Sequence, residues 1–288
     1  MSEGVQARGP TAAATPATAS TPSMGRRVVG AVFAPPLAVL RYFGEHTLLL
    51  ANAVAWLFRR PFRPRLFFEQ MEFVGVGSLV IILLVGFSSG AVASLQAVDA
   101  LAIFRQERFA GATVGISLAQ ELAPVFTALM ITGRAGSGMA TELGSMRITE
   151  QIDALTTFAV NPIQYLVTPR IVASVIMLPV MTMVFNAVGM AGAYVVAIYY
   201  RGVDVGQFVE HYRFWTDPRD YAIGAVKSAF FGLALSVAAC YQGFNVRGGA
   251  KEVGLATTKS VVGGSVSVVV LDYFLSDVLR MFWPKLAE

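Results

Sequence analysis

Residues 133–162 read GRAGSGMATELGSMRITEQIDALTTFAVNP, a polar, Gly-rich and charged stretch between two long apolar segments. Apolar residues recur at helical spacing from Ile148 to Ala159, and charged or amide side chains occupy the other side. The pattern predicts an amphipathic helix over 145–159, ended by Asn161-Pro162. A short surface helix between two membrane-crossing segments is a place where a soluble partner can push on the membrane part.

The composition around this stretch is that of a membrane protein. Hydrophobic residues make up 55% of the chain and charged residues 14%, whereas a soluble domain carries about a quarter charged residues. Residues 73–98 and 171–200 contain no charged residue. Each run is longer than the roughly 20 apolar residues that cross about 30 Å of hydrocarbon. The sequence therefore predicts an all-α integral membrane protein.

Three further apolar segments tolerate a few charges, which brings the expected transmembrane helices to five. Pro179 predicts a kink or tilt in the third span. Gly86 and Gly90 form a GxxxG pair in the first span, which lets helix backbones approach closely and is alone weak evidence for a dimer face. The spans are expected at about 72–95, 113–139, 169–200, 220–243 and 259–281.

Five spans place the two termini on opposite sides of the membrane, and the distribution of Lys and Arg selects the orientation. With the N-terminus inside, the cytoplasmic segments hold fourteen basic residues and the outer segments seven. The sequence therefore predicts a cytoplasmic N-terminus, and it places the 145–159 helix in the cytoplasm between spans two and three. The net charge of +4 mostly reflects this topology and is not the footprint of a nucleic-acid-binding protein.

Two segments precede the first span. Residues 1–25 are rich in Ala, Thr, Pro and Ser, lack the apolar core of a signal peptide, and predict a disordered tail. Residues 32–58 mix an apolar face with charged residues, and the basic run RRPFRPR follows at 59–65. Within 26–65 we therefore expect an amphipathic helix in the cytoplasmic interface and a basic linker against anionic lipid head groups. A solvated linker is the alternative.

The motifs of catalysis and metal binding are missing from the sequence. Cys240, the single cysteine, lies inside a predicted span and predicts neither a disulfide nor a cysteine metal site. His46 and His211 fall in different compartments on the expected topology, so a shared metal site is not expected. No Walker A, GxSxG or HExxH motif occurs, and GRAGSG at 133–138 lacks the spacing of a phosphate loop. We expect no catalytic residue, no metal and no cofactor.

Three charged residues, Glu121, Lys227 and Asp272, lie well inside predicted spans. An unpaired charge in hydrocarbon is costly, so each is expected to face the protein interior and to have a partner. Glu121 and Lys227 are the first pair expected, and Asp272 either joins them or lies near the outer surface. A polar lining of a substrate path and a structural ion pair explain them equally well. Arg134 either snorkels to the interface or contacts substrate.

Seven ordered pieces of the sequence carry a family resemblance: ELAPV (121–125), GRAGS (133–137), ELGSMRITEQIDAL (142–155), AVNP (159–162), PR (169–170), ATTKSVV (256–262) and LDYF (271–274). Together they resemble the MlaE/YrbE permeases of Mce-type ABC lipid transporters. The resemblance runs from about residue 66 to the C-terminus and identifies 66–288 as a permease domain of this type. The N-terminal 25 residues lie outside it.

The resemblance implies a homodimeric permease, or in some members a heterodimer, in the bacterial inner membrane. The implied partners are two cytoplasmic ABC ATPase subunits and an extracytoplasmic MCE-domain protein. The implied cargo is phospholipid or another bulky lipid, which moves through an outward-opening cavity at the dimer interface, lined by spans one, two and five. Glu121 and Lys227 match polar positions near that cavity. Residues 142–159 match the coupling helix that docks on the ATPase, with the polar side chains Glu142, Arg147, Glu150, Gln151 and Asp153.

The leading hypothesis is therefore the permease subunit of an ABC transporter that moves phospholipid or a related lipid between the inner and outer envelope. Partner ATPases drive it through the 142–159 segment, and the chain has no ATP site of its own. One alternative is a membrane anchor for an MCE protein that does not transport. The other is an intramembrane enzyme that uses Glu121 or Asp272 as an acid or base on lipids, which the missing nucleophile–base pair disfavours.

Overall fold

The computed structural model describes residues 40–41, 44–57, 59 and 63–282. The secondary structure of these residues is helical, without a strand. The chain divides into two units, Met1–Glu45 and His46–Glu288. The described residues of the first unit include an ion pair between Arg41 Nε and Glu45 Oε1 at 2.7 Å. The predicted disordered tail, 1–25, lies outside the described residues.

Among the described residues, five helical segments are long and apolar enough to cross a membrane, which confirms the expected all-α membrane fold. They extend beyond most of the predicted ends, because helices continue through polar residues that composition alone assigns to loops. The first begins eight residues before the predicted start, and the second runs nine residues past the predicted end. The segments are Pro64–Ala102, Glu107–Ile148, Ile163–Tyr200, Pro218–Phe244 and Ala250–Leu279.

The first three spans are not single regular α-helices. Short 3₁₀ turns lie at Val76–Ser78 and Glu107–Phe109, and π-helical turns interrupt spans two and three at Leu118–Leu122, Thr132–Gly136, Ile163–Val167 and Val196–Tyr200. The helices between them are α2 (Pro64–Val74), α3 (Leu79–Ala102), α4 (Ala110–Ser117), α5 (Ala123–Ile131), α6 (Ser137–Ile148), α7 (Gln151–Thr157), α8 (Thr168–Val195), α9 (Val205–Trp215), α10 (Pro218–Phe244) and α11 (Ala250–Phe282).

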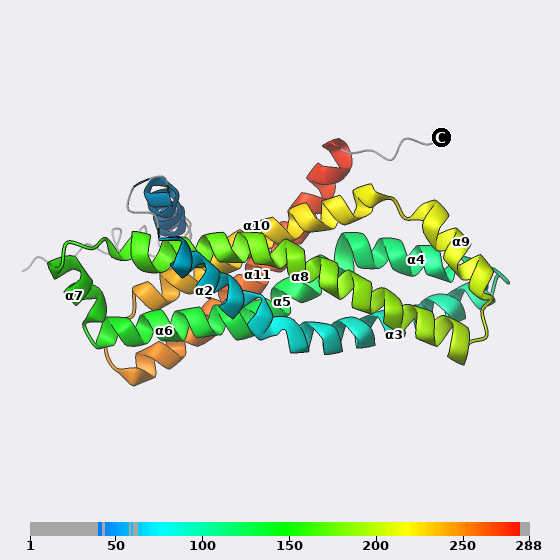
Figure 1. The fold of residues 1–288 in the computed structure, drawn as a ribbon, viewed down its shortest axis with the longest axis horizontal. Helices are drawn as coiled ribbons and strands as arrows, with labels where there is room; N and C mark the ends of the chain where they lie inside the picture. Colours follow the sequence, from blue (N-terminus) through cyan, green and yellow to red (C-terminus); the bar gives the residue numbers. More distant parts are fainter. Residues whose placement is uncertain (1–39, 42–43, 58, 60–62, 283–288) are drawn as a thin grey trace, which may run out of the picture. The chain divides into compact units, whose positions relative to one another are not determined.

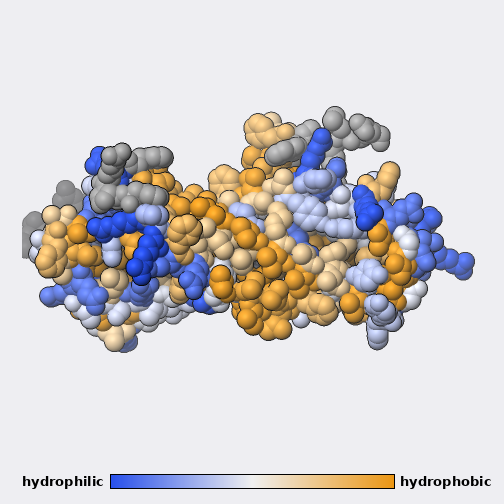
Figure 2. All heavy atoms as spheres, viewed as in Figure 1, coloured by the Kyte–Doolittle hydropathy of each residue, from blue (hydrophilic) through white to orange (hydrophobic). Residues whose placement is uncertain are grey.

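Helices α8 and α10 are at the centre of the packing. Helix α8 packs along both α3 and α10, and α10 in turn packs along α11 (Figure 1). Phe185 of α8 and Phe231 of α10 are fully buried in the main core cluster. The apolar window of α10 is 61% buried and that of α11 only 11%, so α11 leaves most of its apolar surface open. Figure 2 shows apolar residues over the middle of the visible face and hydrophilic residues toward the α7 and α9 ends.

Within the second unit, the helix that ends at residue 57 contributes to a separate apolar cluster. Leu49 and Ala53 are buried there with Ile171 of α8 and Val237 of α10. One face of this helix is thus apolar and packed, as an amphipathic helix requires. Its placement in the membrane interface stays a prediction.

The continuous helix predicted over 145–159 is wrong. Helix α6 ends at Ile148, and the seven-residue α7 begins only after Glu150, whose φ of 59° is left-handed. Ala159 repeats this conformation after α7, with a φ of 56°. An uninterrupted helix of this length would carry the chain roughly 22 Å in one direction, whereas it must reverse to enter α8. The two left-handed residues provide that reversal.

The GxxxG pair of the first span serves packing within the chain. A Cβ at Gly90 would lie 1.8 Å from the carbonyl oxygen of Gly189 in α8, and one at Gly86 would lie 3.4 Å from the carbonyl oxygen of Phe185. Gly192 of α8 meets the carbonyl oxygen of Phe87 in the same way, at 2.3 Å. Small residues on both helices therefore let α3 and α8 approach closely.

Replacing Gly90 with Ala should destabilise the chain by about 1–3 kcal/mol, because the added methyl group forces the two backbones apart. Thermal unfolding in detergent, followed by tryptophan fluorescence, measures the effect. Gly254→Ala in α11 is the control, since nothing lies within 4 Å of its added Cβ, and Ala at such a site stabilises a helix by roughly 0.5–1 kcal/mol. Equal melting temperatures for the two variants would contradict this packing.

Candidate functional site

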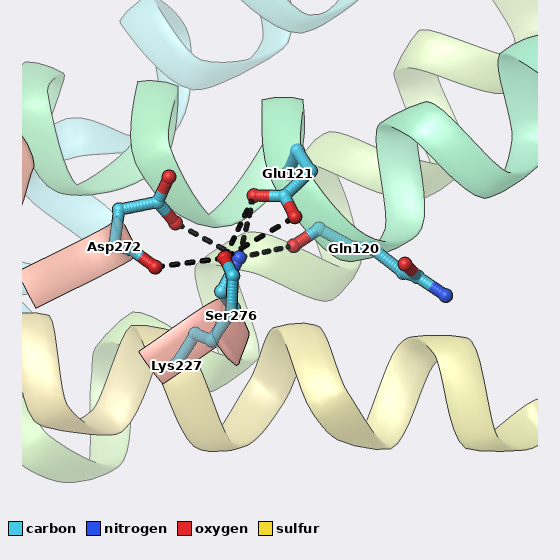
Figure 3. A network of polar contacts seen from close by, with 5 residues as sticks. All are labelled: Gln120, Glu121, Lys227, Asp272 and Ser276. Carbon is cyan, nitrogen blue, oxygen red and sulfur yellow. Dashed lines mark hydrogen bonds and ion pairs between the residues drawn. The ribbon is translucent and has the colours of Figure 1, made fainter. Parts of the chain in front are cut away.

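Three helical spans bring their charged residues together around one lysine. Lys227 of α10 is fully buried, and its Nζ lies 2.5 Å from Glu121 Oε2 and 2.8 Å from Asp272 Oδ1. It also donates a hydrogen bond of 2.9 Å to the carbonyl oxygen of Gln120. Figure 3 shows Lys227 pointing from α10 toward the second span, with Asp272 and Ser276 approaching from α11. The pair expected from the sequence is formed, and Asp272 joins it.

A proline explains why the Gln120 carbonyl is available to Lys227. In a regular helix this oxygen would accept a hydrogen bond from the N–H of residue 124, but Pro124 has no N–H. The interruption coincides with the π-helical turn Leu118–Leu122, which carries both Gln120 and Glu121. The sequence Gln-Glu-Leu-Ala-Pro therefore presents a carboxylate and an unused carbonyl oxygen to the same ammonium group. Pro124 was the sequence signal for this oxygen, and it was missed.

The network extends beyond the three charges that the sequence singled out. Ser276, one turn after Asp272, donates to the Asp272 carbonyl oxygen at 2.7 Å and lies 3.3 Å from Glu121 Oε1. The side chain of Gln120 donates to Asp220 Oδ1 at 2.6 Å. Asp220 also accepts from the backbone N–H of Asp217 in a capping box at the start of α10. Gln120, Asp220 and Ser276 were not expected, because neutral or helix-end residues do not stand out in a hydropathy pattern.

The cluster is asymmetric in charge and in exposure. Two carboxylates face one ammonium group, so the ionised cluster carries one net negative charge. Lys227 is fully buried, whereas the side chains of Glu121 and Asp272 are 36% and 24% exposed. A polar group that approaches the cluster therefore meets carboxylate oxygens first and cannot reach the lysine without displacing them.

Arg134 of the second span contacts the backbone of the first span. Its Nη1 donates to the carbonyl oxygen of Phe73 at 2.6 Å and to Ser78 Oγ at 3.2 Å, and its guanidinium lies over the Phe73 ring. These contacts lie at the junction of α2 and α3, where Gly75 ends the first helix. A side chain at Gly77 would collide with Arg134. The side chain thus satisfies the Phe73 carbonyl oxygen at a helix break, and the interface and substrate roles considered from the sequence stay predictions.

Three of the five polar residues expected to contact an ATPase are held in ion pairs within the chain. Glu142 pairs at 2.7 Å with Arg170 of α8, whose side chain is 3% exposed and also donates to the Leu166 carbonyl oxygen. Arg147 pairs with Asp153 at 2.7 Å across the break between α6 and α7. These contacts tie the C-terminal end of the second span to α7 and to α8. Arg170 was missed as the partner of Glu142, because both residues lie near span ends, where water could serve them as well.

The remaining two, Glu150 and Gln151, are exposed at the start of α7. Gln151 donates only to the hydroxyl of Thr149, at 3.0 Å. Phe158, directly after α7, is 78% exposed and was not singled out in the sequence. The segment thus presents a carboxylate, an amide and an aromatic ring on one short, outward-facing piece of chain. Such a mixture suits a protein partner. No group of three or more potential metal ligands occurs among the residues that the structure describes.

Comparison with known proteins finds similarity over most of the chain. The family model described as Permease MlaE matches residues 67–278. A Probable ABC transporter permease protein of Rickettsia felis is 35% identical over 235 residues, which cover 82% of this chain and 91% of the relative. The Intermembrane phospholipid transport system permease protein MlaE of Haemophilus influenzae is 37% identical over 214 residues, which cover 73% of this chain and 81% of the relative. The chloroplastic protein TRIGALACTOSYLDIACYLGLYCEROL 1 of Arabidopsis thaliana is 34% identical over 209 residues, which cover 73% of this chain and 60% of the relative.

Replacing Lys227 with Met should destabilise the protein by about 3–5 kcal/mol, because it leaves two partly buried carboxylates without their cation. The triple variant Lys227→Met, Glu121→Gln, Asp272→Asn removes all three charges and should regain most of that loss. Thermal unfolding of the purified chain in detergent compares the three proteins. A single variant as stable as the wild type would show that the cluster does not hold α10 and α11 in place.

Proposed function

Because the chain belongs to the MlaE permease family, we propose that it carries phospholipid, or a related lipid, between the inner and outer envelope as the membrane subunit of an ABC transporter. The observation that carries this proposal is the similarity to the Haemophilus phospholipid permease. The family match, 67–278, includes both the charge cluster and the cytoplasmic segment. The chain is a transporter subunit and not an enzyme, since ATP hydrolysis belongs to partner ATPases.

The charge cluster is suited to a lipid path. A phospholipid has an apolar tail and a polar head, so its route needs apolar walls together with a place for the head group. The exposed apolar side chains of α11, which include Val262, Val266 and Val269, provide such a wall. The partly exposed carboxylate of Asp272 belongs to the same helix, and that of Glu121 lies close to it. We assign to them the contact with the polar part of the lipid.

A second copy of this chain is the proposed partner for the open faces of α3 and α11. Only 22% and 11% of the apolar windows in their spans are buried within one chain. A homodimer would cover part of both faces and enclose an outward-opening cavity between them. An MCE-domain protein would receive the lipid on the outer side. The inner membrane is the proposed location, with the N-terminus in the cytoplasm as the basic residues favour.

Force from the ATPases has a direct route into the spans. Helix α7 would dock on the ATPase, and the Arg147–Asp153 pair connects it to α6. The Glu142–Arg170 pair connects α6 to α8. A displacement of α7 would therefore move the ends of spans two and three together, as a rigid-body change rather than a local one.

Glu121→Gln should lower lipid transfer by about tenfold or more, because an amide replaces the charged acceptor at the lipid path. The assay follows a fluorescent phospholipid in proteoliposomes that contain the permease, its ATPase and ATP. Glu69→Gln is the matched control, since Glu69 lies in an exposed ion pair with Arg65. Wild-type transfer by Glu121→Gln would give the cluster a purely structural role.

Glu150→Arg should weaken association with the ATPase by about tenfold while membrane insertion stays normal, because it reverses the charge of an exposed residue at the start of α7. Co-purification with the tagged ATPase measures the change. Glu210→Arg on α9 provides a control of equal charge change on the opposite side of the proposed membrane. Undiminished co-purification of Glu150→Arg would exclude this residue from the ATPase contact.

A further inference from the structure

A small pocket lies where the end of the helix at 44–57 (the N-terminal helix), α2 and the segment after α7 meet. Its volume is about 100 Å³, which suits a single phosphate-sized group and is far below the roughly 300 Å³ or more of a pocket for a whole drug-sized ligand. Trp56, Arg59, Arg63, Leu66, Asn161 and Tyr165 are among its lining residues, and no acidic residue is. The pocket is remote from the charge cluster, and two of its lining residues, Arg59 and Arg63, belong to the basic run 59–65.

Two arginines give the pocket its charge. The Arg59 guanidinium lies 4.8 Å from the centre of the Trp56 ring, and that of Arg63 lies 5.2 Å from the centre of the Tyr165 ring. Stacking of this kind orients the planar guanidinium and leaves its N–H groups available. Within the described part of the chain neither arginine forms an ion pair. Their neighbour Arg65, by contrast, is paired with Glu69 at 2.8 Å.

The pocket combines these cations with apolar surface. Leu57, Leu66 and Phe67 line it and are each only partly buried. A free inorganic anion gains nothing from such side chains, whereas the glycerol and upper acyl carbons of a lipid can cover them. The N–H groups of arginine match the oxygens of a phosphate in pairs. The shared chemistry is therefore a phosphate anion, and its surroundings favour one that belongs to a lipid.

The same pocket is joined to the end of the α7 segment. Asn161 Oδ1 accepts hydrogen bonds from the backbone N–H groups of Ile163 and Gln164, at 2.9 and 3.2 Å. The Gln164 side chain donates to the Arg59 carbonyl oxygen at 2.8 Å. The chain that leaves α7 is thus connected to Arg59 through Gln164 and to Arg63 through the Tyr165 ring. A ligand that fixes Arg59 and Arg63 also fixes this connection.

We propose that the phosphate of an anionic phospholipid binds between Arg59 and Arg63 as a fixed component of the protein, separate from the transported lipid. On the proposed topology this lipid belongs to the cytoplasmic leaflet. It closes the gap between the N-terminal helix and residues 159–164 and thereby steadies the segment on which the ATPase pushes. Efficient coupling then depends on anionic lipid in the membrane.

Native mass spectrometry of the full-length permease complex tests the site with three probes: phosphatidylglycerol, phosphatidylcholine and inorganic phosphate. We expect the wild type to retain phosphatidylglycerol, to retain phosphatidylcholine less, and to keep its phosphatidylglycerol in excess inorganic phosphate. Arg63→Gln should reduce retention by about fivefold. Arg65→Gln removes the same charge from the same run but does not line the pocket, so it should stay close to the wild type. Arg59→Gln is a second pocket variant, should Arg63→Gln purify poorly.

Equal losses in Arg63→Gln and Arg65→Gln would overturn the site and leave only a diffuse basic surface. Equal retention of phosphatidylcholine would remove the selectivity for anionic lipid, and displacement by inorganic phosphate would assign the pocket to the free ion. This proposal rests on the proposed function for its effect on coupling, and transfer assays separate the two. Failure of the wild type to transfer lipid counts against the function alone. Unchanged phosphatidylglycerol retention in both pocket variants counts against the site alone.

Discussion

Burial of the Lys227 ammonium is the constraint on which the arrangement of the spans depends. A cation buried among membrane-spanning helices needs counter-charges and hydrogen-bond acceptors close by, and no single helix supplies them. The second span provides Glu121 and the Gln120 carbonyl oxygen, and α11 provides Asp272. The relative rotation of these helices is therefore fixed by polar contacts. Apolar packing alone, which tolerates sliding and rotation, would specify it less strictly.

The same principle operates at the Thr132–Gly136 turn and at the start of α8, where it acts on backbone groups as well as charges. Arg134 satisfies a carbonyl oxygen at the break between α2 and α3, and Arg170 satisfies the Leu166 carbonyl oxygen and the Glu142 carboxylate. Helix breaks in a membrane protein leave polar groups that water cannot reach. These two arginines lower the hydropathy of the spans. They nevertheless allow the helices to break while the backbone carbonyl groups at the breaks keep their hydrogen bonds.

Much of the fold was predictable from the sequence, because hydrocarbon excludes charge and leaves long uncharged runs such as 73–98 and 171–200. The Glu121–Lys227 pair followed from the same rule, since isolated charges inside predicted spans need partners. The Glu142–Arg170 pair did not follow, because both residues lie near span ends, where water would serve them as well. The break at Glu150 was also missed. Helical periodicity continues across it, and the reversal that enforces it is a property of the tertiary structure rather than of local propensity.

The π-helical turns make these spans unusually sensitive to chain length. Each such turn accommodates one extra residue within a helix. Deleting that residue would restore a regular helix and rotate the part of the helix that follows by about 100°. In the turn Leu118–Leu122 that rotation would carry Glu121 away from Lys227. Insertions and deletions in the sequence of the second span are therefore constrained as tightly as its charged side chains. Substitutions at lipid-facing positions of this span are therefore tolerated far better than any change in its number of residues.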